Sequence, residues 1–193
     1  MSRGSALGSW RTYDRVSREF DLNDCEQLPY EDAAFDVVSS AQGAVLAPDH
    51  CAVGDELARV CALGGRLGLT AWRPGGVGED LLRALASFRA APAEGVGAPL
   101  DWGRPEYVER LLGGAFRLEF FEGVSYEVAE SPEALWQRTL ASFGPLKTQA
   151  AALSDARRLE LHDAFVEFYA RHLGPDGRVA AAREYLVIVG ARR

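Results

Sequence analysis

The sequence has 193 residues, of which 48% are hydrophobic and 25% charged, and its net charge is −7. This length and composition are typical of one soluble globular domain, and they exclude a disordered, collagen-like or coiled-coil chain. No uncharged apolar run approaches the roughly 18 residues that a membrane span needs. The acidic charge argues against nucleic acid or an anionic membrane as the main partner. We therefore expect a single domain over residues 1–193 that binds neither.

The three cysteines, Cys25, Cys51 and Cys61, are odd in number and widely spaced. Residues 1–18 contain no apolar segment of the kind found in signal peptides, so free thiols in a reducing cytoplasm are expected. The same residues are rich in serine and arginine, which leaves an organelle transit peptide as an alternative. Cys25, His50, Cys51 and Cys61 lack metal-ligand spacing, so we expect no metal site.

In the first half of the chain, apolar periodicity predicts a strand, a helix, a strand and a helix. Residues 35–40 form a short apolar run after an acidic turn, which predicts a strand. Pro48 and Asp49 begin a helix, with Asp49 as its N-cap, and Gly64–Gly65 end it. Residues 66–72 predict the next strand, and residues 78–89 the helix after it.

The second half predicts a short helix, a strand, two longer helices and a last strand. Pro105 fits the first turn of the short helix, and the alternation in residues 116–128 is typical of a half-buried strand. Ser131 and Ser154 begin the longer helices. Residues 185–189 form a continuous apolar run, which is typical of a central strand covered on both faces.

The alternation of strands and helices indicates an α/β fold, a mainly parallel sheet with helices on both faces. Ligands of such sheets bind at the carboxyl ends of strands. The loops after residues 20–22, after Ser40 and after Trp72 are therefore the places where a site is expected.

A glycine-rich loop, Gly75–Gly78, follows one predicted strand and opens a helix, as phosphate-binding loops do. The third glycine of that motif would fall on Leu81, and Glu79 and Asp80 already place negative charge at the helix N-terminus. We therefore interpret this segment as a flexible loop before a helix start that satisfies its own backbone groups.

A further short strand is expected at residues 20–22, and an acidic residue, Asp24, lies just past it. A carboxylate at a strand end accepts hydrogen bonds from an exocyclic amine, and the next backbone N–H donates to a ring nitrogen. Asp24 and Cys25 together therefore fit the edge of an adenine. Asp24 as a simple loop or capping residue is an equally good interpretation of these residues alone.

Three segments carry a family resemblance: D-C-E-Q-L-P-Y-E-D-A-A-F-D-V-V-S-S (residues 24–40), A-P-D-H (47–50) and E-L-A-R-V-C-A-L-G-G-R-L-G-L-T-A-W (56–72). At this spacing they resemble class I S-adenosylmethionine-dependent methyltransferases, in particular type 11 domains related to ubiquinone and menaquinone methyltransferases. The resemblance implies S-adenosylmethionine as cofactor. It implies that Asp24 holds the adenine amine, that the Cys25 backbone lies beside the ring, and that Ser40 faces the methionine part.

The resemblance also implies a partial Rossmann-like sheet with an antiparallel last strand and inserted helices before that strand. On this basis residues 1–18 form an atypical N-terminal segment and residues 19–123 the remainder of the cofactor fold. Residues 124–182 form a helical insertion that caps an apolar acceptor pocket, and residues 183–193 the last strand.

The sequence departs from the family upstream of Asp24. Family members carry a glycine-rich loop for the methionine moiety and an acidic residue for the ribose, and neither precedes Asp24 here. We therefore expect an N-terminally truncated methyltransferase. In the family's strand order, 3-2-1-4-5-7-6, the loss of strands 1 and 2 makes residues 35–40 a sheet edge. Residues 1–18 then cover this edge, or it pairs in a homodimer, or it aggregates.

The resemblance implies transfer of a methyl group to a small-molecule acceptor by in-line attack, which needs orientation more than a signature nucleophile. Gln42 and His50, which follow the strand at residues 35–40, are candidates to face the acceptor or to take a proton. His50 as a packed helix-start histidine is the competing interpretation. The alternative function is a catalytically inactive remnant or a binding module.

Overall fold

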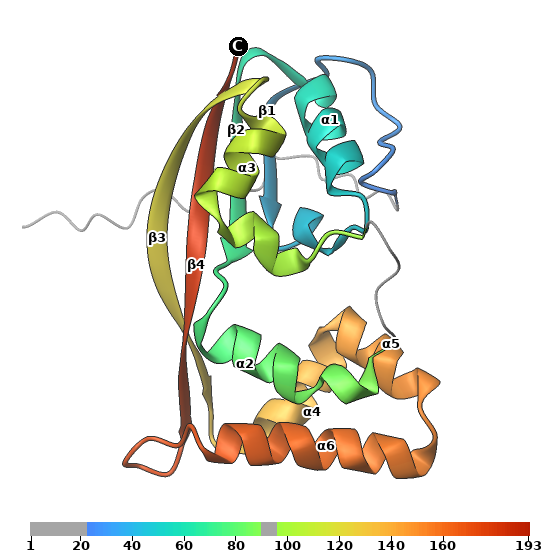
Figure 1. Cartoon of the computed structure of the whole chain (residues 1–193), viewed down its shortest axis with the longest axis vertical. Coiled ribbons are helices and arrows are strands. Elements are labelled where there is room, and N and C mark those ends of the chain that lie inside the picture. Colours follow the sequence, from blue (N-terminus) through green and yellow to red (C-terminus); the bar gives the residue numbers. More distant parts are fainter. Residues whose placement is uncertain (1–22, 90–95) are drawn as a thin grey trace, which may run out of the picture.

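The computed structural model describes residues 23–89 and 96–193, and Figure 1 shows a sheet that carries helices at both of its ends. The expected strand at residues 20–22 and the expected cover from residues 1–18 lie outside the described residues. The strands are β1 (Phe35–Ala41), β2 (Cys61–Trp72), β3 (Phe116–Ala129) and β4 (Val179–Arg192). The α-helices are α1 (His50–Val60), α2 (Gly76–Ala84), α3 (Pro105–Leu112), α4 (Pro132–Ser142), α5 (Gly144–Ala152) and α6 (Asp155–Ala170), and the 3-10 helices are η2 (Ala44–Leu46), η3 (Ala86–Phe88) and η4 (Pro99–Gly103).

The sheet has the strand order β1-β2-β4-β3. β1 pairs parallel with β2, whereas β4 lies antiparallel between β2 and β3, so only β4 runs against the other three strands. This arrangement confirms the predicted α/β sheet with an antiparallel last strand, and α4, α5 and α6 are inserted before that strand. β1 is an edge of the described sheet, as expected.

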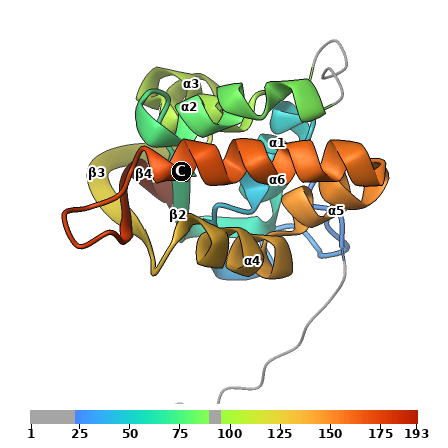
Figure 2. The ribbon, with the colours of Figure 1, turned by 90° about the horizontal axis from the view of Figure 1, so that it is seen from below.

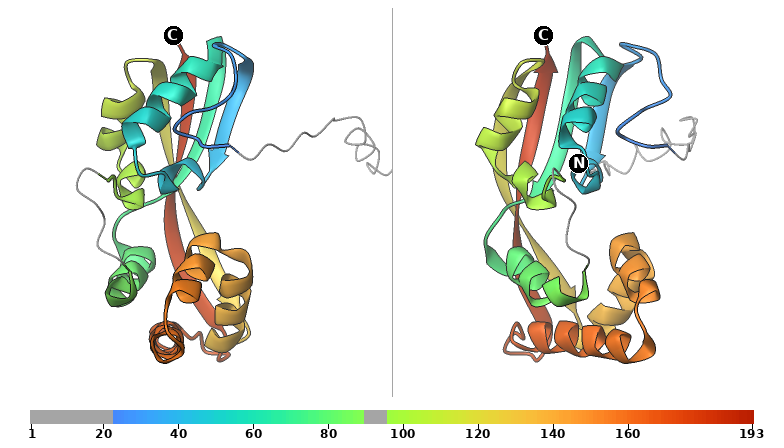
Figure 3. Two further views of the ribbon diagram at one scale, coloured as in Figure 1. Left: turned by 90° about the vertical axis from the view of Figure 1, so that its right-hand side faces the viewer. Right: turned by 45° about the vertical axis from the view of Figure 1, so that its right-hand side comes forward.

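Two hydrophobic cores pack on opposite faces of the long β3–β4 ribbon. Leu186 and Ile188 belong to the first core, with side chains of α1 and α3, whereas Val179 and Ala181 belong to the second core, with side chains of α4, α5 and α6. Because side chains alternate along a strand, these even- and odd-numbered residues face opposite sides. Figure 3 shows α1 and α3 along one end of the sheet, and Figure 2 shows α6 between α2 and α4 at the other.

One face of β4 differs from the expectation of a strand covered on both sides. Leu186 and Ile188 are fully buried, but Tyr185, Val187 and Val189 on the other face remain half-buried. On β1, the side chain of Val37 is 66% exposed. Within the described residues, the helices therefore cover this end of the sheet on one face only. The apolar run correctly predicted a central strand, but it carries no information on which elements reach its second face.

The first helix ends earlier than predicted. α1 stops at Val60, and Cys61 already begins β2, with its side chain buried in the first core. The strand pairing is irregular here, because Phe35 pairs with Cys61 and Val37 with Arg66, so residues 62–65 bulge out of register. Gly64 adopts a positive φ of 78° in this bulge. The glycine pair therefore bends the strand start instead of ending the helix.

The predicted helix starts are confirmed at the level of single hydrogen bonds. The side chain of Asp49 accepts from Ala52 N, that of Ser131 from Ala134 N and that of Ser154 from Arg157 N. None of the helices in residues 23–89 and 96–193 has both the length and the apolar character that a membrane span requires.

Candidate functional site

A tight turn presents Asp24 and Cys25 at the start of the described chain. Asp24 Oδ1 accepts a hydrogen bond from Glu26 N at 2.9 Å, and the Asp24 carbonyl accepts one from Gln27 N at 3.2 Å. Asp24 is exposed, and within the described residues its Oδ2 and the Cys25 N–H make no hydrogen bond to another residue. The turn therefore offers one acceptor and one donor to a ligand.

The Cys25 side chain points inward and packs against the first core. Burial raises the pKa of its thiol, and the neighbouring Asp24 and Glu26 carboxylates act in the same direction. A neutral, partly buried thiol is a packing group rather than a nucleophile. Its role is thus to fix the turn, so that the backbone N–H of Cys25 is the group left available.

The residues around the turn line an open hollow of about 570 Å³. Its walls are residues 23–26 on one side and Ala47 and Pro48, which lead into α1, on the other. Glu26 joins the two sides, since its Oε1 accepts a hydrogen bond from Asp49 N at 2.7 Å. The structure thus brings the predicted adenine-reading turn beside the loop that follows β1.

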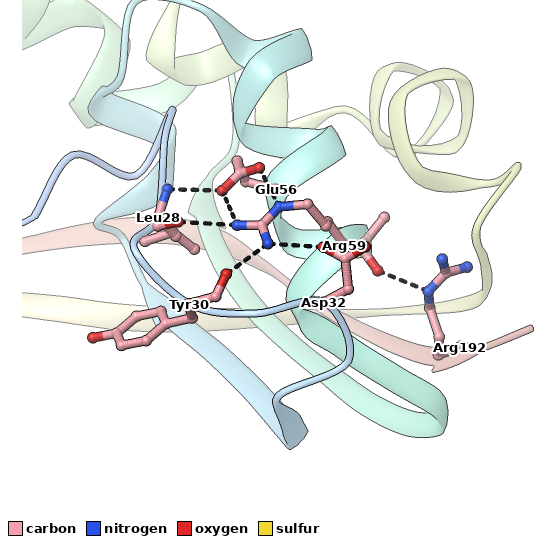
Figure 4. A network of polar contacts seen from close by, with 7 residues as sticks. Leu28, Tyr30, Asp32, Glu56, Arg59 and Arg192 are labelled. Carbon is pink, nitrogen blue, oxygen red and sulfur yellow. Dashed lines mark hydrogen bonds and ion pairs between the residues drawn. The ribbon is translucent and has the colours of Figure 1, made fainter.

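The segment after the turn is attached to α1 by a polar network, shown in Figure 4. Arg59 on α1 donates to the carbonyls of Leu28 and Tyr30, at 3.0 and 2.6 Å. Glu56, one turn earlier on the helix, accepts from Leu28 N at 2.7 Å. These contacts span about thirty positions of sequence, which explains why the sequence pattern alone did not reveal them.

At the carboxyl end of β1, the side chain of Ser40 supports the following turn. Ser40 Oγ accepts a hydrogen bond at 2.9 Å from the N–H of Ala44, the first residue of η2. Gln42 has a φ of +61°, a left-handed conformation that is uncommon outside glycine. Its Oε1 is buried without a hydrogen-bond partner among the described residues. Strained residues of this kind concentrate at functional sites.

His50 lies inside the fold rather than on its surface. Only 3% of it is exposed, and its Nδ1 lies 2.7 Å from the Tyr107 hydroxyl. Burial lowers the pKa of the imidazole, and the nearby Asp101 opposes this shift only in part. Its Nε2 and the Nε1 of the adjacent Trp102 have no hydrogen-bond partner in the described part of the chain. His50 is therefore a neutral, packed histidine beneath the loop, as in the competing sequence interpretation.

The glycine loop at residues 75–78 behaves as the sequence indicates. Glu79 Oε2 accepts a hydrogen bond from Gly75 N at 2.6 Å. The carboxylate thus occupies the position that a phosphate would need, because an anion at the start of α2 would meet Glu79.

The order and direction of the strands identify the class of fold. The order β1-β2-β4-β3 with β4 antiparallel corresponds to the 4-5-7-6 part of the class I methyltransferase sheet. The Asp24–Cys25 turn lies at the carboxyl edge of that sheet, next to the loop after β1. The chain thus has the fold of class I S-adenosylmethionine-dependent methyltransferases, and Asp24 and Cys25 lie beside the loop that follows β1 in this fold.

Comparisons with known proteins agree with this class. Residues 7–69 match the family model described as a methyltransferase domain. YcgJ from Bacillus subtilis has a similar structure, with a TM-score of 0.54 and 16% identity over 95% of this chain and 74% of that one. BH2331 from Bacillus halodurans C-125, a protein assigned as a methyltransferase, matches with a TM-score of 0.52 and 18% identity. That match covers 88% of this chain and 69% of the other. The predicted resemblance to class I methyltransferases is confirmed.

Curated relatives come from mycobacteria. The chain is 32% identical to the uncharacterized protein Rv1405c of Mycobacterium tuberculosis over 182 residues, which are 92% of this chain and 65% of that protein. It is 39% identical to Rv1403c of the same organism over 89 residues, 45% of this chain and 32% of that one. The chain thus spans slightly less than two thirds of the length of the longer-matching relative.

Proposed function

We propose that this chain binds S-adenosylmethionine and takes part in transfer of its methyl group to a small-molecule acceptor. The observation that carries the proposal is the Asp24–Cys25 turn, in which one acceptor and one donor make no hydrogen bond to the rest of the described chain, beside the loop after β1. The family-model match over residues 7–69 supports the same reading.

The proposed contacts follow from hydrogen-bond complementarity. Adenine presents an amine donor next to a ring-nitrogen acceptor on one edge. Asp24 Oδ2 accepts from the amine, and the Cys25 N–H donates to the ring nitrogen. Asp24 Oδ1 stays engaged with Glu26 N, which fixes the carboxylate in a single orientation. The pair therefore distinguishes adenine from a base that carries a carbonyl at the same position.

The cofactor, when bound, supplies an activated methyl group on a sulfonium. The chain's own residues orient the partners and exclude water. Ser40 keeps a hydroxyl proton to donate beyond its bond from Ala44 N, and Gln42 places a carbonyl oxygen at the end of β1. We assign Ser40 to the methionine part of the cofactor and Gln42 to the methyl acceptor. His50, packed and neutral, supports this loop through Tyr107.

A binding module without catalysis is the second candidate. It is favoured by β1, which is an edge of the described sheet and carries the exposed side chain of Val37. An edge of this kind is a template for pairing with a second copy. We propose homodimerisation through β1 as part of this second candidate.

The test is a calorimetric titration of the folded 193-residue chain with S-adenosylmethionine. We expect micromolar binding that Asp24→Ala weakens about tenfold or more, since hydrogen bonds to charged groups contribute about 1.5–3 kcal/mol. Asp176→Ala is the matched control, because Asp176 Oδ1 makes the same kind of turn bond, to Arg178 N, at the other end of the molecule. No heat up to millimolar cofactor would contradict the proposal and favour the binding module.

A further inference from the structure

We infer that Arg59 and Glu56 are positioning residues, which hold the Asp24–Cys25 turn in the geometry that reads adenine. This inference rests on the proposed function. Neither side chain lines the hollow beside the turn. Both lie on α1, and they influence cofactor binding only through the segment at residues 28–32, which they hold in place.

The guanidinium of Arg59 uses every donor that it has. Nε and one Nη2 hydrogen bind the two oxygens of Glu56 as a fork, at 2.6 and 2.7 Å. The remaining three hydrogens go to Leu28 O, Tyr30 O and the Asp32 carboxylate. An arginine has five N–H donors in a fixed plane, and all five are engaged here. A lysine ammonium has three donors and no planar fork, so it cannot reproduce this set.

Glu56 completes the attachment from the acceptor side. Its Oε2 accepts from Leu28 N as well as from Arg59, so both backbone groups of Leu28 are bound to α1. The Arg59 hydrogen bond holds the pKa of the Glu56 carboxyl below its usual value, and Glu56 with Asp32 raises that of Arg59. Both shifts favour the charged forms of the two side chains.

The segment that follows Asp24 is consequently attached to α1 at two points. Glu26, two residues after Asp24, binds Asp49 N at the start of α1, and Leu28 binds the middle of the same helix. Cys25, directly before Glu26, packs against the first core. With the segment attached at both points, the Asp24 carboxylate and the Cys25 N–H keep one mutual orientation. Preorganisation of this kind lowers the entropy cost of binding.

The pair contributes to the site more than to the core. The side chains of Arg59 and Glu56 are 30% and 15% exposed, whereas α1 packs on the sheet through the buried Val53, Leu57 and Val60. A change at Arg59 therefore leaves that packing in place. It releases the segment at residues 28–32, and through it the turn.

The experiment measures cofactor affinity and local order in Arg59→Lys and Glu56→Gln. We expect both variants to bind S-adenosylmethionine about tenfold or more weakly than wild type. Arg83→Lys is the control, since Arg83 pairs with Glu79 and Asp80 on α2. In an Asp24→Ala background, Arg59→Lys is expected to add little, because both changes remove the same contact.

Amide hydrogen exchange supplies a readout without cofactor. The N–H groups of Glu26, Gln27 and Leu28 are expected to exchange faster in Arg59→Lys, while Val53 N–H, bonded to Asp49 O inside α1, stays unchanged. Wild-type affinity in Arg59→Lys, or unchanged exchange at residues 26–28, would overturn the positioning role alone. Absence of binding by the wild-type chain would overturn the proposed function and this role with it.

Discussion

Removal of one hydroxyl tests whether the buried histidine depends on its neighbour. In Tyr107→Phe, His50 loses the partner of its Nδ1, which lies 2.7 Å from the Tyr107 hydroxyl. Its Nε2 has no partner among the described residues, so a ring that is 3% exposed then keeps only the backbone of Val45 as a polar neighbour to offset the loss. An unsatisfied buried polar group costs about 1–3 kcal/mol, and we expect the free energy of unfolding to fall by that amount.

The assay is equilibrium unfolding in urea, with Tyr126→Phe as the matched control. Tyr126 lies on β3 and is 64% exposed, so water replaces its hydroxyl and no change is expected. A Tyr107→Phe variant as stable as Tyr126→Phe would refute the reasoning. It would show that His50 reaches another partner once the tyrosine hydroxyl is gone.

Two further predictions concern α6 and the sheet edge. Hydrogen bonds to Asp163 and Glu133 raise the pKa of His162 above its unfolded value of 6.5, so its stabilisation is complete below that pH and is lost as pH rises through the folded pKa. The stability gap between wild type and His162→Gln, measured by urea unfolding, should therefore close at alkaline pH, and a constant gap would contradict this linkage. If the chain pairs through β1, its sedimentation should show concentration-dependent association. Lysine on an edge strand opposes pairing, so Val37→Lys should lower this association, whereas Leu159→Lys on α6 should not. Wild-type chain that sediments as a monomer at high concentration would exclude the dimer.

Features that depend on near neighbours in sequence were predictable. Asp49, Ser131 and Ser154 cap helices with bonds to residues three positions later, and such bonds follow from local residue type. The strand at residues 35–40 and the central strand at residues 185–189 were likewise correct in kind, because both are short runs that contain the β-branched residues typical of strands.

Features that join distant parts of the chain were not predictable. Arg59 binds Leu28 and Tyr30 across about thirty positions, and His50 meets Tyr107 across 57. Neither contact produces a periodic pattern in the sequence from which it could have been predicted. The half-exposed face of β4 was missed for a related reason, since hydrophobicity shows that a strand is central but not what covers it. The sequence assigned only the backbone of Cys25 to the candidate site, and the inward orientation of its side chain depends on the packing of the core.

Selective ¹⁵N-cysteine labelling gives the most direct test of the central claim, that the cofactor's adenine docks on the Asp24–Cys25 turn. The chain has three cysteines, and therefore three amide signals. The amides of Cys51, on the exposed surface of α1, and of Cys61, in the core, serve as internal references. The amide of Cys25 is the predicted donor to adenine. Titration with S-adenosylmethionine should shift the Cys25 amide proton downfield and leave Cys61 in place, and Asp24→Asn should weaken the transition. Saturating cofactor that leaves the Cys25 signal unmoved would contradict the account.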